Sequence, residues 1–179
     1  MRQISSIPFD IFSVRFKARL ALLALGPLLG SAPAALADLK IDRLVIEKSQ
    51  RVLILEHDGA PVRSYSIALG GAPRGHKQRE GDQRTPEGQY TIDARNEDSA
   101  FHRSLRISYP NEADRRRAAM EGVNPGGQIM IHGIGEADPE MRKLHPYIDW
   151  TAGCVAVTDS EIEEIWALVE IGTPIVIRP

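Results

Sequence analysis

The chain has 179 residues, of which 42% are hydrophobic and 26% are charged, and its formal net charge is −2 at pH 7. This composition is typical of a soluble globular protein, and the length predicts one domain with a sizeable core. A weakly acidic chain lacks the basic footprint of a non-specific nucleic-acid-binding protein, so we expect no nucleic-acid partner. A single cysteine excludes an intramolecular disulfide framework.

The first 37 residues have the features of a secretory signal peptide. Three bases between residues 15 and 19 precede the apolar run 20–29, and small residues end in the A-x-A pattern Ala35-Leu36-Ala37. We expect cleavage at this point, a periplasmic location and no stable membrane insertion afterwards, with an uncleaved anchor as the alternative. Removing residues 1–37 leaves 18 bases, 23 acids and a net charge of −5 on the expected mature domain, residues 38–179.

Short β-rich runs open the mature chain. Residues 44–46, 52–55 and 62–69 are separated by polar turns, and the second turn contains Asp58-Gly59. Short strands joined by tight turns predict an antiparallel meander.

Residues 70–88 form a long loop with five glycines and many charges. A structureless stretch of this length in a compact domain is usually functional or disordered. No helix-forming run follows to present its N-terminus to a phosphate, so a nucleotide loop is disfavoured and we expect no cofactor. Arg74, Lys77 and Arg84 either face an acidic substrate or form a solvated surface, and the sequence leaves both open.

The rest of the chain alternates between strands, loops and short helices. Beyond Cys154, an apolar stripe of four residues follows the capping box Thr158–Glu161, which is typical of a core-facing helix. The expected elements are strands over 89–93, 101–109, 128–131 and 174–177, a helix capped by Asn111 or Asp114 that runs to about Met120 and is ended by Gly122, a helical turn over 139–144, and a helix from Thr158 ended by Gly172.

Cys154 and His132 are the candidate chemical groups. A lone cysteine is more often a small buried hydrophobe than a nucleophile. Three features favour the nucleophile here. Gly153 allows a ligand to approach the thiol, and His132-Gly133 supplies a base at the end of an apolar strand. In addition, a free thiol without a function would be exposed to oxidation in the compartment to which the protein is expected to be exported. We therefore expect these two residues to meet and to perform acyl transfer.

Two other kinds of site fit the sequence less well. A zinc site would use His132, His145 and Cys154, but these residues match no compact ligand spacing, so we expect no metal. A serine hydrolase is disfavoured because no G-x-S-x-G motif occurs.

Three segments then carry a resemblance to a known family. The sequence resembles the L,D-transpeptidase (YkuD-type) catalytic domain at Thr85-Pro86-Glu87-Gly88-Gln89-Tyr90, Ile131-His132-Gly133 and Thr151-Ala152-Gly153-Cys154, in an order that spans most of residues 40–178. The resemblance implies a mainly β protein, an L,D-transpeptidase-type β-sandwich with short peripheral helices. It also implies Cys154 as nucleophile, His132 as base with its ring oriented by the Gly133 carbonyl, and an oxyanion held by the Gly153 and Cys154 N–H groups.

The substrate that the resemblance implies is a peptidoglycan stem peptide. Cys154 would attack the diaminopimelate carbonyl, release D-Ala and pass the acyl group to an amine, a reaction of cell-wall organisation and cell shape. The groove is then expected to be lined by the cations Arg74, Lys77 and Arg84 and by two residues next to the thiol, Trp150 and Thr151.

The sequence departs from the family pattern at two positions. Ala152 replaces the usual histidine of the cysteine motif, and Ala156 replaces an Arg or Asn that helps to bind substrate or support the cysteine loop. The tail of the motif looks more like a subgroup that contains amidases, which detach lipoprotein from peptidoglycan. A peptidoglycan amidase or carboxypeptidase and a non-catalytic wall-binding module therefore remain alternatives.

Overall fold

The computed structural model describes residues 40–136 and 139–179, so the expected signal peptide lies outside the described residues. None of the helices in these two ranges combines the length and the apolar character that crossing a membrane requires. In chain order the elements are β1 (Arg43–Glu47), the 3₁₀ turn η2 (Lys48–Gln50), β2 (Val52–His57), β3 (Ala60–Ser66), β4 (Gly88–Ser99), β5 (His102–Ile107), α1 (Glu112–Glu121), β6 (Met130–His132), α2 (Pro139–Leu144), β7 (Val155–Ala156), α3 (Asp159–Leu168) and β8 (Pro174–Arg178).

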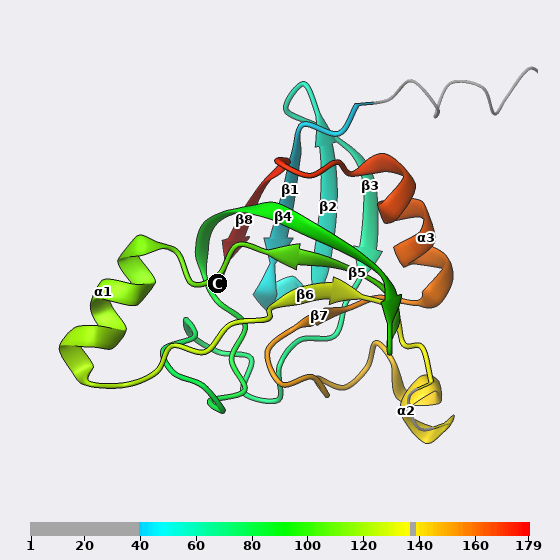
Figure 1. The fold of residues 1–179 in the computed structure, drawn as a ribbon. Helices are drawn as coiled ribbons and strands as arrows, with labels where there is room; N and C mark the ends of the chain where they lie inside the picture. The colour runs from blue at the N-terminus through cyan, green and yellow to red at the C-terminus, as the bar shows by residue number, and fades with distance from the viewer. Residues whose placement is uncertain (1–39, 137–138) are drawn as a thin grey trace, which may run out of the picture. The chain divides into compact units, whose positions relative to one another are not determined.

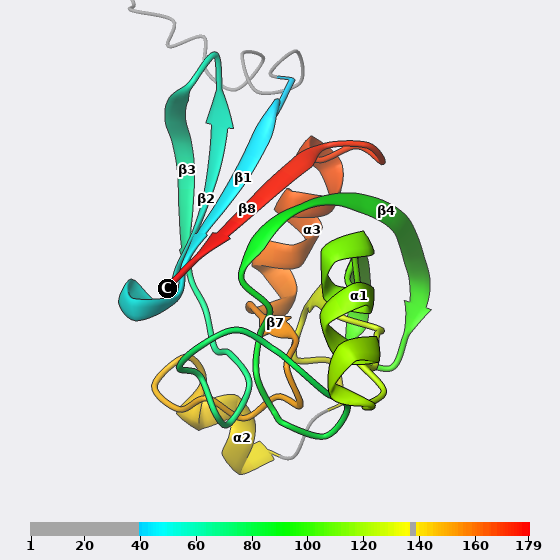
Figure 2. The same cartoon turned by 90° about the vertical axis from the view of Figure 1, so that its left-hand side faces the viewer.

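The eight strands form one sheet in the order β3-β2-β1-β8-β4-β5-β6-β7. β4 belongs to both halves of the sheet, because its start pairs with β8 and its remainder pairs with β5. The curved path of β4 folds the sheet over, so that the two halves face each other (Figures 1 and 2). A bridge between Ala68, which follows β3, and Ala156 in β7 connects the outer edges. The expected mainly β sandwich with short peripheral helices is confirmed.

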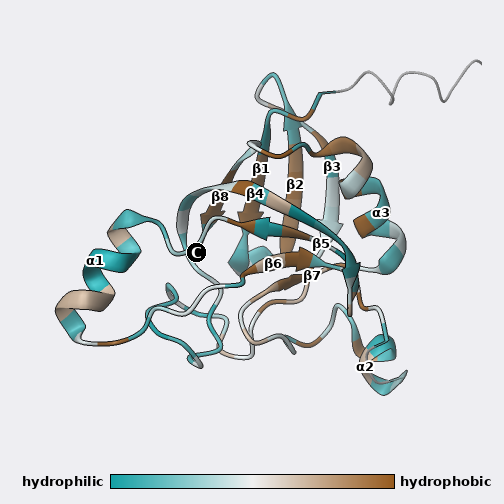
Figure 3. Ribbon diagram, in the orientation of Figure 1, coloured by the Kyte–Doolittle hydropathy of each residue, from teal (hydrophilic) through white to brown (hydrophobic). Residues whose placement is uncertain are grey.

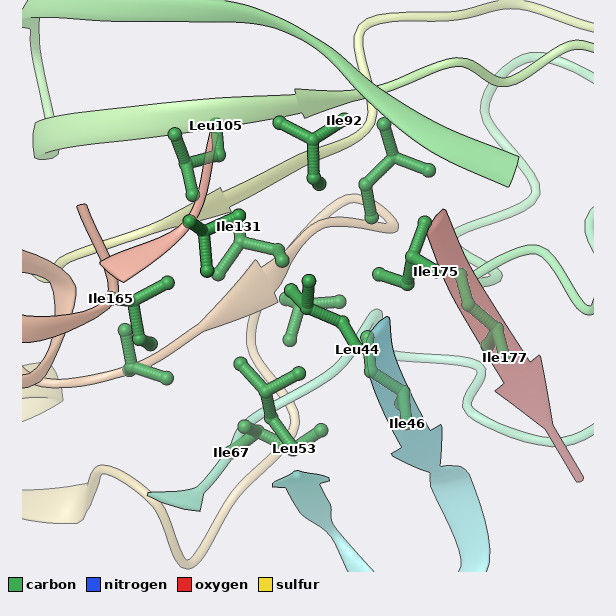
Figure 4. Close-up of a cluster of buried hydrophobic side chains, with 14 of the residues drawn as sticks. Leu44, Ile46, Leu53, Ile67, Ile92, Leu105, Ile131, Ile165, Ile175 and Ile177 are labelled. Atoms are coloured by element: carbon green, nitrogen blue, oxygen red, sulfur yellow. The ribbon is translucent and has the colours of Figure 1, made fainter. Parts of the chain in front are cut away.

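Branched apolar side chains fill the space between the two halves. Figure 4 shows residues from β1, β2, β8, β4, β5 and β6 pointing toward one another, and Figure 3 shows that hydrophobic residues follow these strands while α1 and α2 are largely hydrophilic. α3 packs against β5 and β6 and adds Ile162, Ile165 and Trp166. Full burial of such a side chain contributes about 1.5–3 kcal/mol. Ile131 in β6 and Val155 in β7 are completely buried in this core, so the core determines which face of these two strands points outward.

The cap signals in the sequence predict where both long helices begin. The Asn111 side chain accepts the Asp114 N–H at the start of α1, and Thr158 and Glu161 form the expected capping box at the start of α3. Gly122, with φ 66°, ends α1 as expected. The prediction that Gly172 ends the last helix is wrong: α3 stops at Leu168, because Val169 leaves the helical conformation, and Gly172 lies in the turn before β8.

Candidate active site

The pairing of β6 with β7 brings Cys154 and His132 to one face of the sheet. The strands are parallel, with Ile131 opposite Val155 and His132 opposite Ala156. Side chains alternate along a strand, and Ile131 and Val155 point into the core. His132 and Cys154 therefore share the outer face, one strand spacing (about 4.8 Å) apart across the sheet and two residues (about 6.6 Å) apart along it.

The thiol of Cys154 lies against the backbone at the start of β6. Its Sγ accepts the Met130 N–H at 3.4 Å and is 3.5 Å from the Gln128 carbonyl, to which the S–H can donate. Cys154 is half-buried, so the sulfur is held in place without being sealed in the core. Gln128 has a left-handed backbone with φ 57°, a conformation that is costly for a residue with a side chain and is concentrated at functional sites.

The imidazole of His132 has a defined tautomer. Its Nδ1 is 2.6 Å from the Gly133 carbonyl oxygen, and because a carbonyl only accepts, Nδ1 carries the proton and Nε2 can accept one. The ring packs against Phe101, at 4.6 Å between centroids, and edge-on against Trp150, at 5.8 Å. The Trp150 indole N–H donates in turn to Nδ1 of His145 at 3.5 Å. These contacts orient the imidazole ring.

Burial sets the resting charge of both groups. It lowers the pKa of His132 below its ordinary value, and the nearby His145 adds to this effect while the bond to Gly133 opposes it. Burial also raises the pKa of the Cys154 thiol, against the opposing influence of the Met130 N–H and the Lys77 charge. At neutral pH we therefore expect a neutral thiol beside a neutral imidazole, an arrangement in which the base removes the thiol proton during attack.

Three histidines, of which His132 and His145 are buried and His76 is half-buried, should make stability depend on pH. Burial is the main cause that lowers the pKa of His76, His132 and His145. The unfolded chain binds protons at these rings once the pH falls through about 6.5, whereas the folded protein does so only at lower pH. Stability is then complete above pH 6.5 and is lost as the pH falls below it, with a slope of up to about 1.4 kcal/mol per pH unit for each ring. Urea unfolding from pH 7.5 to 5 measures this, and a constant free energy of unfolding would contradict it.

Thr151 shapes the turn that presents the thiol. Its hydroxyl accepts the Gly153 N–H at 3.1 Å and donates to the Cys154 carbonyl at 2.8 Å, and the side chain is buried. Gly153 has φ 131°, and a Cβ there would lie 2.7 Å from the Arg84 carbonyl oxygen. Only glycine fits this turn.

The N–H groups near the thiol are used differently from the sequence expectation. The Gly153 N–H is held by Thr151, and the Gly133 N–H donates to the Arg103 carbonyl at 3.4 Å. Gly133 thus contributes through its carbonyl, as the resemblance implies. Within residues 40–136 and 139–179 the Cys154 N–H has no hydrogen-bond acceptor, which leaves it available to a developing oxyanion.

The segment after β3 is tied to the cysteine loop. Leu69 donates its N–H to the Asp149 carboxylate at 2.9 Å and accepts the Thr151 N–H at 3.1 Å, and Gly71 donates to the Thr151 carbonyl at 3.0 Å. Arg51 pairs with Asp149 at 2.7 Å. Asp149 is therefore a structural anchor for the thiol-bearing loop.

The three cations predicted to line the groove occupy different environments. Lys77 is only 3% exposed, and its ammonium is held by Asp82 at 2.8 Å and by the Arg79 carbonyl at 3.1 Å. Arg74 is exposed and lines a cavity of about 430 Å³ with Lys48 and Arg51. Lys77 can act on the thiol through its charge, whereas Arg74 has a side chain open to solvent.

Arg84, the third of these cations, lies over Gly75 and has no ion-pair partner in the described ranges. Its backbone carbonyl, rather than its guanidinium, packs against Gly153. The charge pattern of the loop could not distinguish these environments, because all three cations lie in the same glycine-rich stretch.

Three residues at this site were absent from the sequence expectations. Phe101 covers the His132 ring, Asp149 anchors the cysteine loop, and Lys48, buried at 2% exposure, holds the loop 70–88 through Gly75, Thr85 and Glu87. No local signal marks these residues, because each contact joins distant parts of the chain. Strand alternation, however, could have assigned Met130 and His132 to one face.

Cys154, His132 and His145 do not form a compact set of metal ligands. In the described part of the chain, the group of ligand atoms close enough together for an ion consists of Asp42, His57 and Asp58, which lie away from the thiol. Nothing in the geometry favours the zinc interpretation of the cysteine.

Comparison with known proteins gives a family match over nearly the whole described chain. The family model described as L,D-transpeptidase catalytic domain (YkuD) matches residues 41–177. A curated relative, named "Putative L,D-transpeptidase YafK" in Escherichia coli (strain K12), is 33% identical over 109 residues, which cover 59% of this chain and 36% of the relative. The chain thus spans about a third of the length of the curated relative.

Solved structures share the fold. Pgp2 of Campylobacter jejuni, described as a helical cell shape determining protein, superposes with a TM-score of 0.59 at 21% identity, over 79% of this chain and 48% of that one. Bd1075 of Bdellovibrio bacteriovorus superposes with a TM-score of 0.55 at 24% identity, over 78% of this chain and 48% of that one. The chain covers about half of each of these proteins, and at such identities the likeness concerns the fold.

Proposed function

The chain belongs to the L,D-transpeptidase catalytic domain family, and on this premise we propose that it is a cysteine acyltransferase that acts on peptidoglycan stem peptides. The observation that supports this most directly is the shared outer face of Cys154 and His132, with a partly exposed sulfur and an imidazole whose Nε2 is free to take a proton. A thiol and a base in this relation are the minimum for covalent acyl transfer.

The proposed reaction has two halves. Cys154 Sγ attacks the carbonyl of the diaminopimelate residue as His132 Nε2 takes the thiol proton, and the proton then passes to the amine of the departing D-Ala. The thioester that remains is resolved by an amine of another stem peptide, which regenerates the thiol and forms a cross-link. The Cys154 N–H is the oxyanion donor in this scheme, and such a donor contributes about 2.7–4 kcal/mol in a hydrolase precedent.

Hydrolysis is the second candidate outcome, and Ala156 favours it. Ala156 is fully buried, lies opposite His132 and is bridged to Ala68, so the site lacks the Arg or Asn that the family pattern has there. With fewer groups to hold an acceptor amine, water could resolve the thioester, which would make the protein a carboxypeptidase or an amidase. A periplasmic location after signal cleavage is part of the same proposal, since it brings the enzyme to its substrate.

Product analysis tests the function. Protein purified from the periplasm is incubated with disaccharide-tetrapeptides. Mass spectrometry identifies the peptide products, and intact-protein mass spectrometry detects any covalent adduct on the protein. We expect release of D-Ala, cross-linked dimers and a covalent adduct at Cys154 after addition of a carbapenem. Shortened peptides without dimers would support hydrolysis. If the protein neither turns over the peptides nor forms an adduct, the result supports the alternative of a non-catalytic wall-binding module.

A further inference from the structure

The outer face of β4, β5, β6 and β7 carries two rows of side chains that include the catalytic pair. Antiparallel pairing sets Asn96 opposite Ser104 and Ser104 opposite His132. The neighbouring row contains Ala94, Arg106 and Met130, and the β6–β7 register continues it to Cys154. Arg106 is thus two strand spacings from Cys154, about 9.6 Å, which is roughly the span of three extended residues.

A cavity of about 200 Å³ occupies this face. Its lining includes Asn96, Ser104, Arg106, Gln128 and Met130. Gln128 and Met130 are also the residues whose backbone contacts the sulfur, so two of the residues that line the cavity border the thiol as well.

A second hollow shares two lining residues with the first. It measures about 520 Å³, shares Arg106 and Gln128 with the smaller cavity, and extends to Asn111 and Arg115 at the start of α1. Arg106 and Gln128 thus line both hollows, one on the side of Met130 and the other on the side of α1.

Polar groups in the smaller cavity are left without protein partners. Arg106 donates through Nε to Asp93 at 2.7 Å, and its two terminal nitrogens have no acceptor among the described residues. Ser104 is almost buried, and its hydroxyl likewise makes no hydrogen bond within residues 40–136 and 139–179. Asp93 therefore fixes the plane of the guanidinium while the donor edge stays free, which is the geometry that binds a carboxylate.

We propose that Arg106, oriented by Asp93 and assisted by Ser104, is the specificity-determining residue that binds a free carboxylate of the acyl-donor stem peptide. This inference rests on the proposed function, because it names the group that the same site recognises. The Arg or Asn that the family pattern has at position 156 is missing here, and Arg106 supplies a positively charged side chain to the same face from two strands away. A stem peptide offers two such carboxylates within a few residues of the scissile bond, on the isoglutamate and on the diaminopimelate side chain.

The test compares Arg106→Gln with the wild type on three tetrapeptides: one with both carboxylates free, one amidated at isoglutamate and one amidated at diaminopimelate. Loss of a charge-assisted hydrogen bond should raise KM for the free peptide by about tenfold to a hundredfold and leave kcat within about twofold. Wild-type protein should show the same rise with one of the two amidated peptides. On that peptide the Arg106→Gln variant should show no further loss.

The matched control is Arg63→Gln. Arg63 also pairs with an exposed carboxylate, that of Glu164 at 2.8 Å, but it lies on β3, outside the catalytic face, so its KM should equal that of the wild type. Alkylation of Cys154 by iodoacetamide, which needs no carboxylate site, should proceed equally in all three proteins.

Each other result decides against the proposal. If the wild type turns over and Arg106→Gln has the same KM, the carboxylate site is refuted while the proposed function stands. If the variant loses activity equally on free and amidated peptides, the guanidinium serves the fold and the inference fails. If the wild type neither turns over nor forms a carbapenem adduct, the proposed function is refuted and the inference with it.

Discussion

Replacing Cys154 by alanine is expected to abolish D-Ala release, with a fall in rate of more than about a thousandfold, as removal of a nucleophile does in other enzymes. The only thiol of the chain is lost, and the hydroxyl of Ser104, which lies opposite His132, is a much weaker nucleophile than a thiol. The sulfur is partly exposed and makes two long contacts with Met130 and Gln128. The free energy of unfolding should therefore change by no more than about 1 kcal/mol.

Cys154→Ser provides the control for shape. It keeps a hydroxyl in the place of the thiol, but an imidazole whose pKa is lowered by burial is too weak a base to activate an alcohol efficiently without further support. We expect this variant to be folded and nearly inactive, and to form no carbapenem adduct. Steady-state kinetics and urea unfolding measure both properties, and an alanine variant that retains more than a tenth of the activity would rule out Cys154 as the nucleophile.

Gly153→Ala is expected to fold less stably and to lose most of its activity. The residue has φ 131°, so a side chain adds backbone strain of about 1–3 kcal/mol. Its Cβ would also lie 2.7 Å from the Arg84 carbonyl oxygen. The backbone at residue 153 or at Arg84 must therefore move to relieve this contact. Since a displacement of about 1 Å at a reacting group can cost a hundredfold in rate, we expect kcat to fall by that factor or more.

Gly172→Ala separates backbone strain from displacement of the thiol. Gly172 also has a positive φ, 95°, but a Cβ there would meet no atom within 4 Å. This variant should lose stability and keep its kcat. Equal kcat values for the two alanine variants would show that the contact between Gly153 and Arg84 does not position the thiol.

Elements with local signals could be predicted from the sequence. The cap at Thr158 predicts the start of α3, one of the two cap candidates, Asn111, is the cap of α1, and the turn at Asp58-Gly59 predicts the hairpin of β2 and β3. These signals act within three or four residues, so neighbours along the chain are enough to recognise them.

β4 shows where local patterns were insufficient. The expected strand covered residues 89–93, whereas β4 runs from Gly88 to Ser99. Its second half is polar, and its register with β5 shifts after Ile92 and again after Asn96. Such shifts interrupt the alternation of apolar and polar residues by which a half-buried strand is recognised. Without this extension the outer face near Arg106 could not be predicted.

The sequence by itself determined the mainly β character of the chain, the approximate positions of most elements and the two candidate reactive residues, Cys154 and His132, because strand runs, caps, turns and residue identity are local properties. Only the tertiary structure decided that β7 pairs with β6, that the thiol faces outward beside the imidazole, that Lys77 is buried against Asp82 and that Arg106 lies on the same face of the sheet as His132. Strand order and register are set by how all the apolar side chains pack into one core, and this choice involves residues far apart in the chain.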